Sequence, residues 1–210
     1  MFAQLDTKTV YSFMDSLIDL EGYVKEAKVL GYQTIGIMDK DNLYAAFHFI
    51  EIAKKQGIRP VLGLELTLDI QENLSVTFYL IARDTQGYKN LMKVSSRQMT
   101  NGIQLEDLND YLQGIAVIIP YFEDLESISV PFDYYIGVDI HSEEREYNKP
   151  ILPLHTVRYF NTNEVETLHM LHAIRDNVSL KDAPLVPQNQ HLVACDILTQ
   201  AFEQKFPKAL

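Results

Sequence analysis

Charged side chains follow three short apolar segments in the first third of the sequence. Asp6 and Lys8 follow the first segment, Asp39 and Lys40 follow the second, and Glu65 lies near the end of the third. Such segments are typical of strands, and functional residues of parallel α/β barrels gather at the carboxyl ends of strands. Carboxylate oxygens suit Mg²⁺, whereas a protonated lysine has no lone pair to offer a metal. These residues are therefore either a site or solvated charges where strands reach the surface.

Histidines and further charges occur later in the chain. Asp139 follows a later expected strand, and His155 and Arg158 follow the last one. His169 and His172 are three residues apart on an expected helix, so they share one face of it. Such a pair can hold a metal, but a packed or solvated pair is the simpler interpretation.

Apolar periodicity and turn residues divide the chain into alternating strands and helices. The expected strands are 2–6, 34–38, 60–68, 75–82, 114–119, 134–139 and 151–154. The expected helices are 19–30, 43–55, 86–95, 105–112, 163–174 and 194–205. Because strands and helices alternate over short connections, we expect parallel βαβ units with right-handed crossovers. This alternation favours an α/β barrel over an open sheet, with a polar connector over 176–190.

The composition limits the class of protein. The 210 residues are 47% hydrophobic, which suits one globular domain with an ordinary core. Cys195 is the only cysteine, so an internal disulfide is excluded and a reducing, cytoplasmic location is expected. The sequence shows no signal peptide and no apolar run near the ~20 residues that span a bilayer, so we expect no membrane partner. The net charge of −11 repels phosphates, so DNA would be held mainly by regions outside this chain.

Several blocks of the sequence occur in the order of one known family. The first three align on Phe2, Leu5, Tyr11, Ser12 and Asp15, then on Asp39 and Asn42, then on Gly57, Ile58, Pro60, Gly63 and Glu65. LIARDTQGYKNLMKVSS and the terminal AFEQKFPKAL add two more blocks. Together they resemble the N-terminal PHP (polymerase and histidinol phosphatase) domain of bacterial DNA polymerase III alpha subunits. The resemblance implies a distorted seven-stranded (β/α)7 barrel over 1–210, with a core of about 1–175 and a connector and helix over 176–210 that lead to a polymerase core.

The resemblance also implies a metal site that this sequence does not reproduce. Active members of the superfamily hold a metal cluster with histidines. The positions that correspond to those histidines carry Asp6, Lys8, Lys40, Thr77 and Arg158. Asp39 and Glu65 are retained, and His155 is a candidate vestigial ligand. We therefore expect no catalytic residue and no resident metal or cofactor, with Asp6, Asp39 and Glu65 as weak candidates for Mg²⁺. Our hypothesis is that Lys8, Lys40 and Arg158 supply the positive charge that metals supply elsewhere in the family.

These departures imply a structural and protein-interaction domain of a replicative polymerase. The parent chain would be a DNA-directed DNA polymerase, a nucleotidyltransferase that uses Mg²⁺ in its polymerase core. The expected partners are that core, a proofreading exonuclease and other proteins of the replication machinery. One alternative is an active metal-dependent phosphoesterase, such as a 3′-5′ proofreading exonuclease. Another is a free-standing small-molecule phosphatase related to histidinol phosphatase.

Overall fold

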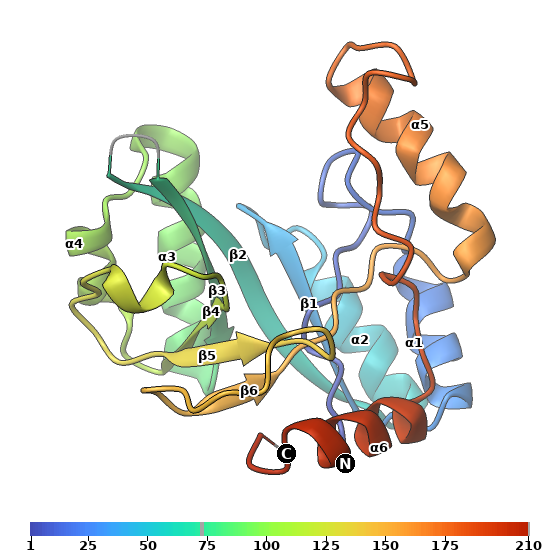
Figure 1. Cartoon of the computed structure of the whole chain (residues 1–210), viewed down its shortest axis with the longest axis horizontal. Coiled ribbons are helices and arrows are strands. Elements are labelled where there is room, and N and C mark those ends of the chain that lie inside the picture. The colour runs from blue at the N-terminus through green and yellow to red at the C-terminus, as the bar shows by residue number, and fades with distance from the viewer. Residues whose placement is uncertain (72–73, 210) are drawn as a thin grey trace.

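The computed structural model of the chain describes residues 1–71 and 74–209, and its centre is one curled sheet (Figure 1). The strands of this sheet are β1 (Thr34–Lys40), β2 (Arg59–Gln71), β3 (Leu74–Ala82), β4 (Ile115–Pro120), β5 (Tyr135–Val138) and β6 (Ile151–Pro153). They lie side by side in sequence order. The mixed α/β class that the sequence predicts is therefore confirmed.

The expected parallel pairing across a helix is confirmed for β1 and β2, whereas β3 breaks the parallel pattern of the sheet. The pairs β1–β2, β4–β5 and β5–β6 are parallel, but β3 is antiparallel to both β2 and β4. Only two residues separate β2 from β3. Parallel neighbours need a crossover of a dozen or more residues, so a connection this short forces the chain to reverse. Because β4 reverses again, β4 to β6 run in the direction of β1 and β2.

The first expected strand, 2–6, forms isolated bridges in place of a named strand. Its backbone lies between β1 and residue Val157. Gln4 O accepts a hydrogen bond from Gly36 N of β1 (2.6 Å), and Asp6 O accepts one from Val157 N (2.9 Å). The next residue continues the pairing with β1, because Thr7 O accepts from Met38 N (2.8 Å). On its other side Lys8 N donates to Val157 O (2.9 Å). The described residues thus contain six named strands, and the amino-terminal segment bridges the gap between β1 and the chain that follows β6.

The expected helices all form, with small changes at their ends. They are α1 (Leu20–Val29), α2 (Ala46–Gln56), α3 (Thr85–Asn101), α5 (Val165–Arg175), α6 (Cys195–Lys205) and the pair α4 (Leu105–Leu108) with the 3₁₀ turn η1 (Asn109–Tyr111); further 3₁₀ turns are η2 (Leu125–Ser127) and η3 (Thr162–Glu164). Asp19 caps α1 by accepting a hydrogen bond from Gly22 N (2.7 Å). Helix α2 begins later than predicted because Asn42 holds a turn, its Oδ1 accepting from Tyr44 N (3.1 Å). Helix α3 runs past the predicted residue 95 because no breaker occurs before Gly102, whose φ is +71°.

The helices cover the sheet unevenly. Figure 1 shows α1 and α2 beside β1 and α3 on the other side of the molecule. Helix α5 stands away from the sheet, and the irregular chain that follows it runs back beside it. The amino-terminal segment packs against α6, where the rings of Phe2 and Phe202 stack with their centroids 5.3 Å apart. No helix among the described residues is long and apolar enough to cross a lipid bilayer.

Candidate functional site

A fully buried lysine occupies the centre of the predicted site. Lys8 Nζ lies 2.6 Å from Asp6 Oδ1 and 2.5 Å from Glu65 Oε2, and it sits 4.4 Å from the centre of the Tyr79 ring. The other Asp6 oxygen, Oδ2, accepts a hydrogen bond from Thr156 Oγ1 (2.6 Å). Each of these carboxylates therefore already has a charged donor at short range, and the ammonium is the ion they share.

Three elements bring these groups together. Asp6 lies at the end of the bridging segment and Lys8 follows two residues later. Alternate residues of an extended chain point the same way, so the two side chains share a side. In the register of the sheet, the backbone of Glu65 lies opposite Lys40 at the end of β1 and opposite Tyr79 of β3. It was predicted near a strand end, but β2 continues to Gln71, so Glu65 lies inside the longest strand of the sheet.

Burial and charge act against each other at this centre. Burial alone would raise the pKa of Asp6, but Lys8, Thr156 and Arg158 outweigh it, so that pKa is lowered. Burial alone would lower the pKa of Lys8, but the nearby Asp6, Tyr79 and Glu65 outweigh it, so that pKa is raised. Burial raises the pKa of Tyr79 and Asp6 adds to the effect, so its phenol stays protonated. The pair is therefore ionised, and Lys8 stays a cation.

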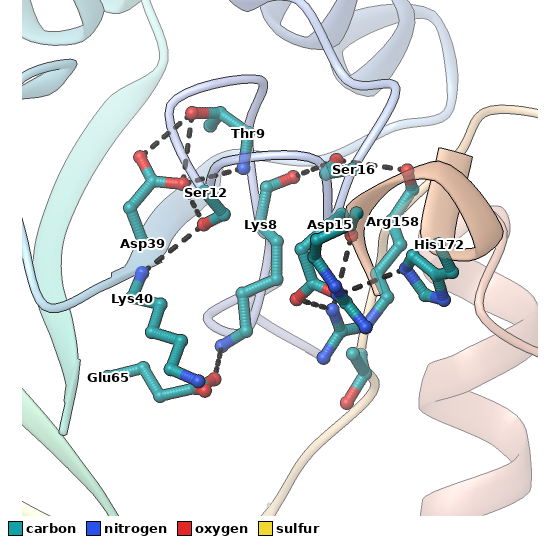
Figure 2. Close-up of polar contacts among 12 residues, drawn as sticks. Lys8, Thr9, Ser12, Asp15, Ser16, Asp39, Lys40, Glu65, Arg158 and His172 are labelled. Atoms are coloured by element: carbon teal, nitrogen blue, oxygen red, sulfur yellow. Dashed lines mark hydrogen bonds and ion pairs between the residues drawn. The ribbon is translucent and has the colours of Figure 1, made fainter. Parts of the chain in front are cut away.

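Asp39 is held by neutral donors and not by a cation. Its Oδ1 accepts hydrogen bonds from Thr9 N (2.7 Å) and Ser12 Oγ (2.7 Å), and its Oδ2 accepts from Thr9 Oγ1 (2.8 Å). Burial raises the pKa of Asp39 in spite of these bonds. Figure 2 shows this cluster on the opposite side of Lys8 from Asp15. Asp39 thus anchors the loop after the amino-terminal segment.

The other predicted cations lie outside the centre. The Lys40 side chain is exposed, and in the described part of the chain it makes no ion pair within 4.0 Å. Its backbone N donates to Ser12 Oγ (3.2 Å) and its backbone O accepts from Asn42 Nδ2 (2.9 Å). Arg158 Nη1 instead pairs with Asp15 Oδ2. Of the three cations Lys8, Lys40 and Arg158, Lys8 is therefore the one whose ammonium or guanidinium group contacts Asp6 and Glu65.

Asp15 is the centre of a second charged cluster that the sequence did not point to. It is shared by Arg158, by Arg175 Nη1 (3.0 Å from Asp15 Oδ1) and by His172 Nε2 (3.1 Å). Figure 2 shows Arg158 and His172 converging on Asp15. This cluster ties α5 to the loop that Asp39 anchors. Asp15 matches the family pattern, but Arg175 is more than 150 residues away in sequence, and no spacing rule links the two.

Tyr79 is the residue of the site that the sequence analysis missed. The predicted position on the same strand, Thr77, lies two residues away and faces Thr67, with their Oγ1 atoms 3.2 Å apart. Residues two apart on a strand share a face, so both side chains project on the same side of β3. The signal that could have found Tyr79 is this periodicity, combined with an aromatic ring opposite a retained carboxylate.

His155 lies beside the centre and is itself nine-tenths buried. Its Nε2 is 2.8 Å from the carbonyl oxygen of His191, so Nε2 carries the proton and donates. Burial lowers the pKa of His155, more than its bond to His191 raises it, and the ring is neutral. It lines a cavity of about 440 Å³ together with Asp6, Tyr79 and Asp139. Asp139 accepts hydrogen bonds there from the backbone of its own turn.

The two helix histidines have separate partners. His169 Nε2 lies 3.2 Å from the carbonyl oxygen of Ala183, whereas His172 meets Asp15. They hold different segments and do not converge on one point.

The donor set does not fit the multinuclear metal cluster that the family pattern implies. Within residues 1–71 and 74–209 no three His, Cys, Asp or Glu side chains are grouped so that they could share an ion. The geometry gives the reason: the Lys8 ammonium stands between Asp6 and Glu65, and Asp39 is turned toward Thr9 and Ser12. A divalent cation between the two carboxylates would have to displace a buried ammonium ion first.

Comparison with known proteins identifies the class. A profile of the PHP domain family matches residues 4–156, so the chain belongs to the PHP domain family. It is 53% identical over 212 aligned residues to the DNA polymerase III subunit alpha of Streptococcus pyogenes serotype M3, which covers all of this chain and 20% of that protein. The corresponding subunit of Rickettsia bellii is 33% identical over 129 residues, covering 58% of this chain and 11% of its own. The resemblance seen in the sequence is thereby confirmed, and the chain spans about a fifth of the length of the curated relatives it matches.

Solved structures are more distant. An amidohydrolase from Chromobacterium violaceum with bound sulfate aligns over 95% of this chain and 96% of its own, with 10% sequence identity and a TM-score of 0.49.

Proposed function

We propose that this chain is the PHP domain of a bacterial DNA polymerase III alpha subunit, and that the domain is a structural brace without hydrolytic activity. The parent chain would carry out DNA-directed DNA synthesis with Mg²⁺ in a polymerase core outside these 210 residues. The support is the match to polymerase subunits along the whole chain. A place in a replicative polymerase also agrees with the cytoplasmic location and the replisome partners expected from the sequence, a proofreading exonuclease among them.

The single observation that carries the structural role is the position of the Lys8 ammonium. It lies within 2.6 Å of both carboxylates that an ion of the family cluster would need. Lys8 cannot act as a ligand while protonated, and its raised pKa keeps it so. In this proposal Asp6, Lys8, Asp39, Lys40, Glu65, Thr77, His155 and Arg158 are the vestigial equivalents of the family site.

The same proposal extends to the fold. The bridging segment 2–6 takes the place of the seventh strand, because it is hydrogen-bonded to β1 on one side and to Val157 on the other. The chain would then be a distorted seven-stranded barrel with a core of about 1–175. The segment 176–210 would be a connector and helix, with α6 packed against Phe2.

The alternative is a metal-dependent phosphoesterase or proofreading exonuclease, and the cavity of about 440 Å³ beside Asp6 and His155 is the observation in its favour. Thermal unfolding with Zn²⁺, Mn²⁺ or Mg²⁺ separates the two. A resident ion at 100 times its dissociation constant would stabilise the fold by about 2.7 kcal/mol, so we expect no rise in melting temperature with any of them. Hydrolysis of a phosphodiester substrate that needs metal and disappears in Glu65→Gln would establish the alternative.

A further inference from the structure

The negative charge is distributed unevenly along the sequence, and helix α3 carries no acidic residue. The segment 121–149 contains eight Asp or Glu residues and only two Lys or Arg residues, within a total net charge of −11. Helix α3 contains Lys89, Lys93 and Arg97 and no acidic residue over its 17 residues. Arg97 is paired with Asp107 (2.7 Å), whereas Lys89 and Lys93 are exposed and pair with no carboxylate within 4.0 Å among the described residues. Two exposed cations therefore lie on the middle of α3, with Asp84 at its N-cap and Asp107 on Arg97 as the neighbouring acids.

Large apolar side chains are exposed on α3 and around the start of α2. Met92 and Met99 of α3 are 41% and 57% exposed, and Tyr44 and Phe47 are 64% and 73% exposed. Tyr44 Oη donates to Met99 Sδ (3.5 Å), so the start of α2 and the end of α3 are in contact. Phe47 is three residues after Tyr44, at the spacing that places side chains on one side of a helical turn. We call Tyr44, Phe47, Lys89, Met92, Lys93 and Met99 the α3 surface.

The framework under these side chains is fixed. Ser95 Oγ donates to Asp41 O (2.8 Å), which joins α3 to the turn before α2 from beneath. Lys89, Met92, Lys93 and Ser96 line one shallow hollow on α3. Lys89 and Lys93 are one turn apart, and the ten residues from Lys89 to Met99 extend along the helix by about 15 Å. The backbone positions that carry the cations and the aromatic rings are therefore fixed relative to one another.

We propose that the α3 surface binds single-stranded DNA, with Lys89 and Lys93 on phosphates and the rings of Tyr44 and Phe47 stacked on bases. Exposed aromatic rings beside cations are the combination used for single strands, because every base offers a flat face and the backbone offers charge. A duplex hides those base faces, and two lysines are too few to hold it by charge alone on a molecule of net charge −11. The choice of DNA rests on the proposed function, whereas the surface itself rests on charge and exposure.

The test measures fluorescence anisotropy of a labelled dT12 oligonucleotide against the 210-residue chain, with EDTA present. We expect weak saturable binding whose logarithmic salt dependence has a slope of about −1.4, the value for two phosphates on a single strand. The double variant Lys89→Glu and Lys93→Glu should lose about tenfold or more in affinity near 20 mM salt and most of the slope. The double variant Tyr44→Leu and Phe47→Leu should weaken binding and leave the slope unchanged.

The matched control is Lys54→Glu with Lys55→Glu at the end of α2, the same charge change on exposed lysines outside the α3 surface. Its affinity for dT12 should stay within about twofold, since those lysines contact no phosphate in this proposal. Equal losses in the two lysine pairs would mean that only net charge matters, and the proposal would be wrong. Absence of saturable binding, or tighter binding of a poly-glutamate peptide than of dT12, would also overturn it, the latter in favour of an acidic protein partner. Because EDTA is present, none of these outcomes depends on whether the family metal site is active.

Discussion

Replacing Lys8 by methionine tests the proposed role of the buried ammonium most directly. Methionine keeps most of the length and the apolar stem of lysine but removes the charge. Asp6 and Glu65 then lose the cation that lies 2.6 Å and 2.5 Å from them. Breaking a buried ion pair by removing one partner costs about 3–5 kcal/mol, because it leaves a buried charge without compensation.

The expected loss is large relative to the stability of the whole domain. A domain is stable by about 5–15 kcal/mol, and in one of 150–250 residues each kcal/mol shifts the melting temperature by about 2–4 °C. Lys8→Met should therefore lower the melting temperature by about 6–20 °C, and the free energy of unfolding in urea, followed by circular dichroism, gives the loss itself.

Two further variants separate charge from packing. Lys40→Met changes an exposed lysine that makes no ion pair among the described residues, so its effect should stay within about 0.5 kcal/mol. Adding Asp6→Asn and Glu65→Gln to Lys8→Met removes the uncompensated charges and should recover a large part of the loss. A Lys8→Met variant as stable as Lys40→Met would refute the reasoning, and a triple variant no more stable than Lys8→Met would show that packing and not charge is responsible.

Three other outcomes follow from the same contacts. Asp15→Ala should speed proteolysis of the segment after α5, because α5 loses its tie to the loop, whereas Asp176→Ala should leave the cleavage rate unchanged; equal rates would contradict the tie. Asp39→Asn should cost about 1–3 kcal/mol in urea unfolding, because its amide nitrogen cannot accept the hydrogen bonds of the loop; a neutral change would show that the loop holds itself. The lowered pKa of His155 means that the unfolded chain binds its proton first, so stability should fall as pH drops below about 6.5 and fall less in His155→Gln; parallel pH profiles of wild type and variant would contradict this.

Most of the fold could be predicted from the sequence because local patterns determine it. The apolar stretch that ends at Asp39 and the helix capped by Asp19 lie where periodicity and capping place them. The direction of β3 could have been predicted too, since Gln71 and Leu74 leave too short a gap for a crossover. Bridging by segment 2–6 could not, because its pairing partners, Ile35 and Val157, are set by closure of the sheet and not by neighbouring residues.

The site was predictable only to the extent that it follows strand ends. Asp6 and Lys8 were found in this way, whereas Glu65 was picked as a strand end although β2 continues to Gln71. The hypothesis that Lys8 supplies positive charge agrees with its contacts. The same rule could not separate Lys8 from Lys40, because each follows an aspartate at an expected strand end: Lys8 comes two residues after Asp6, and Lys40 comes directly after Asp39. Their burial differs because one side chain points inside the curled sheet and the other outward, and that depends on tertiary structure.

The two charged clusters influence each other. Lys8 is the cation in contact with Asp6 and Glu65, whereas Arg158 and Arg175 contact Asp15, and Arg175 also pairs with Asp176. The guanidinium of Arg158 is bonded to Asp15, yet its charge lowers the pKa of Asp6, and Asp15, Asp6 and Glu65 raise the pKa of Arg158 against the effect of burial. A divalent ion added between Asp6 and Glu65 would lie beside the buried Lys8 ammonium, where repulsion between like charges is costly. Arg158 therefore acts on the centre at a distance: its charge favours the ionised form of Asp6, and its contact with Asp15 links the region around Lys8 to α5.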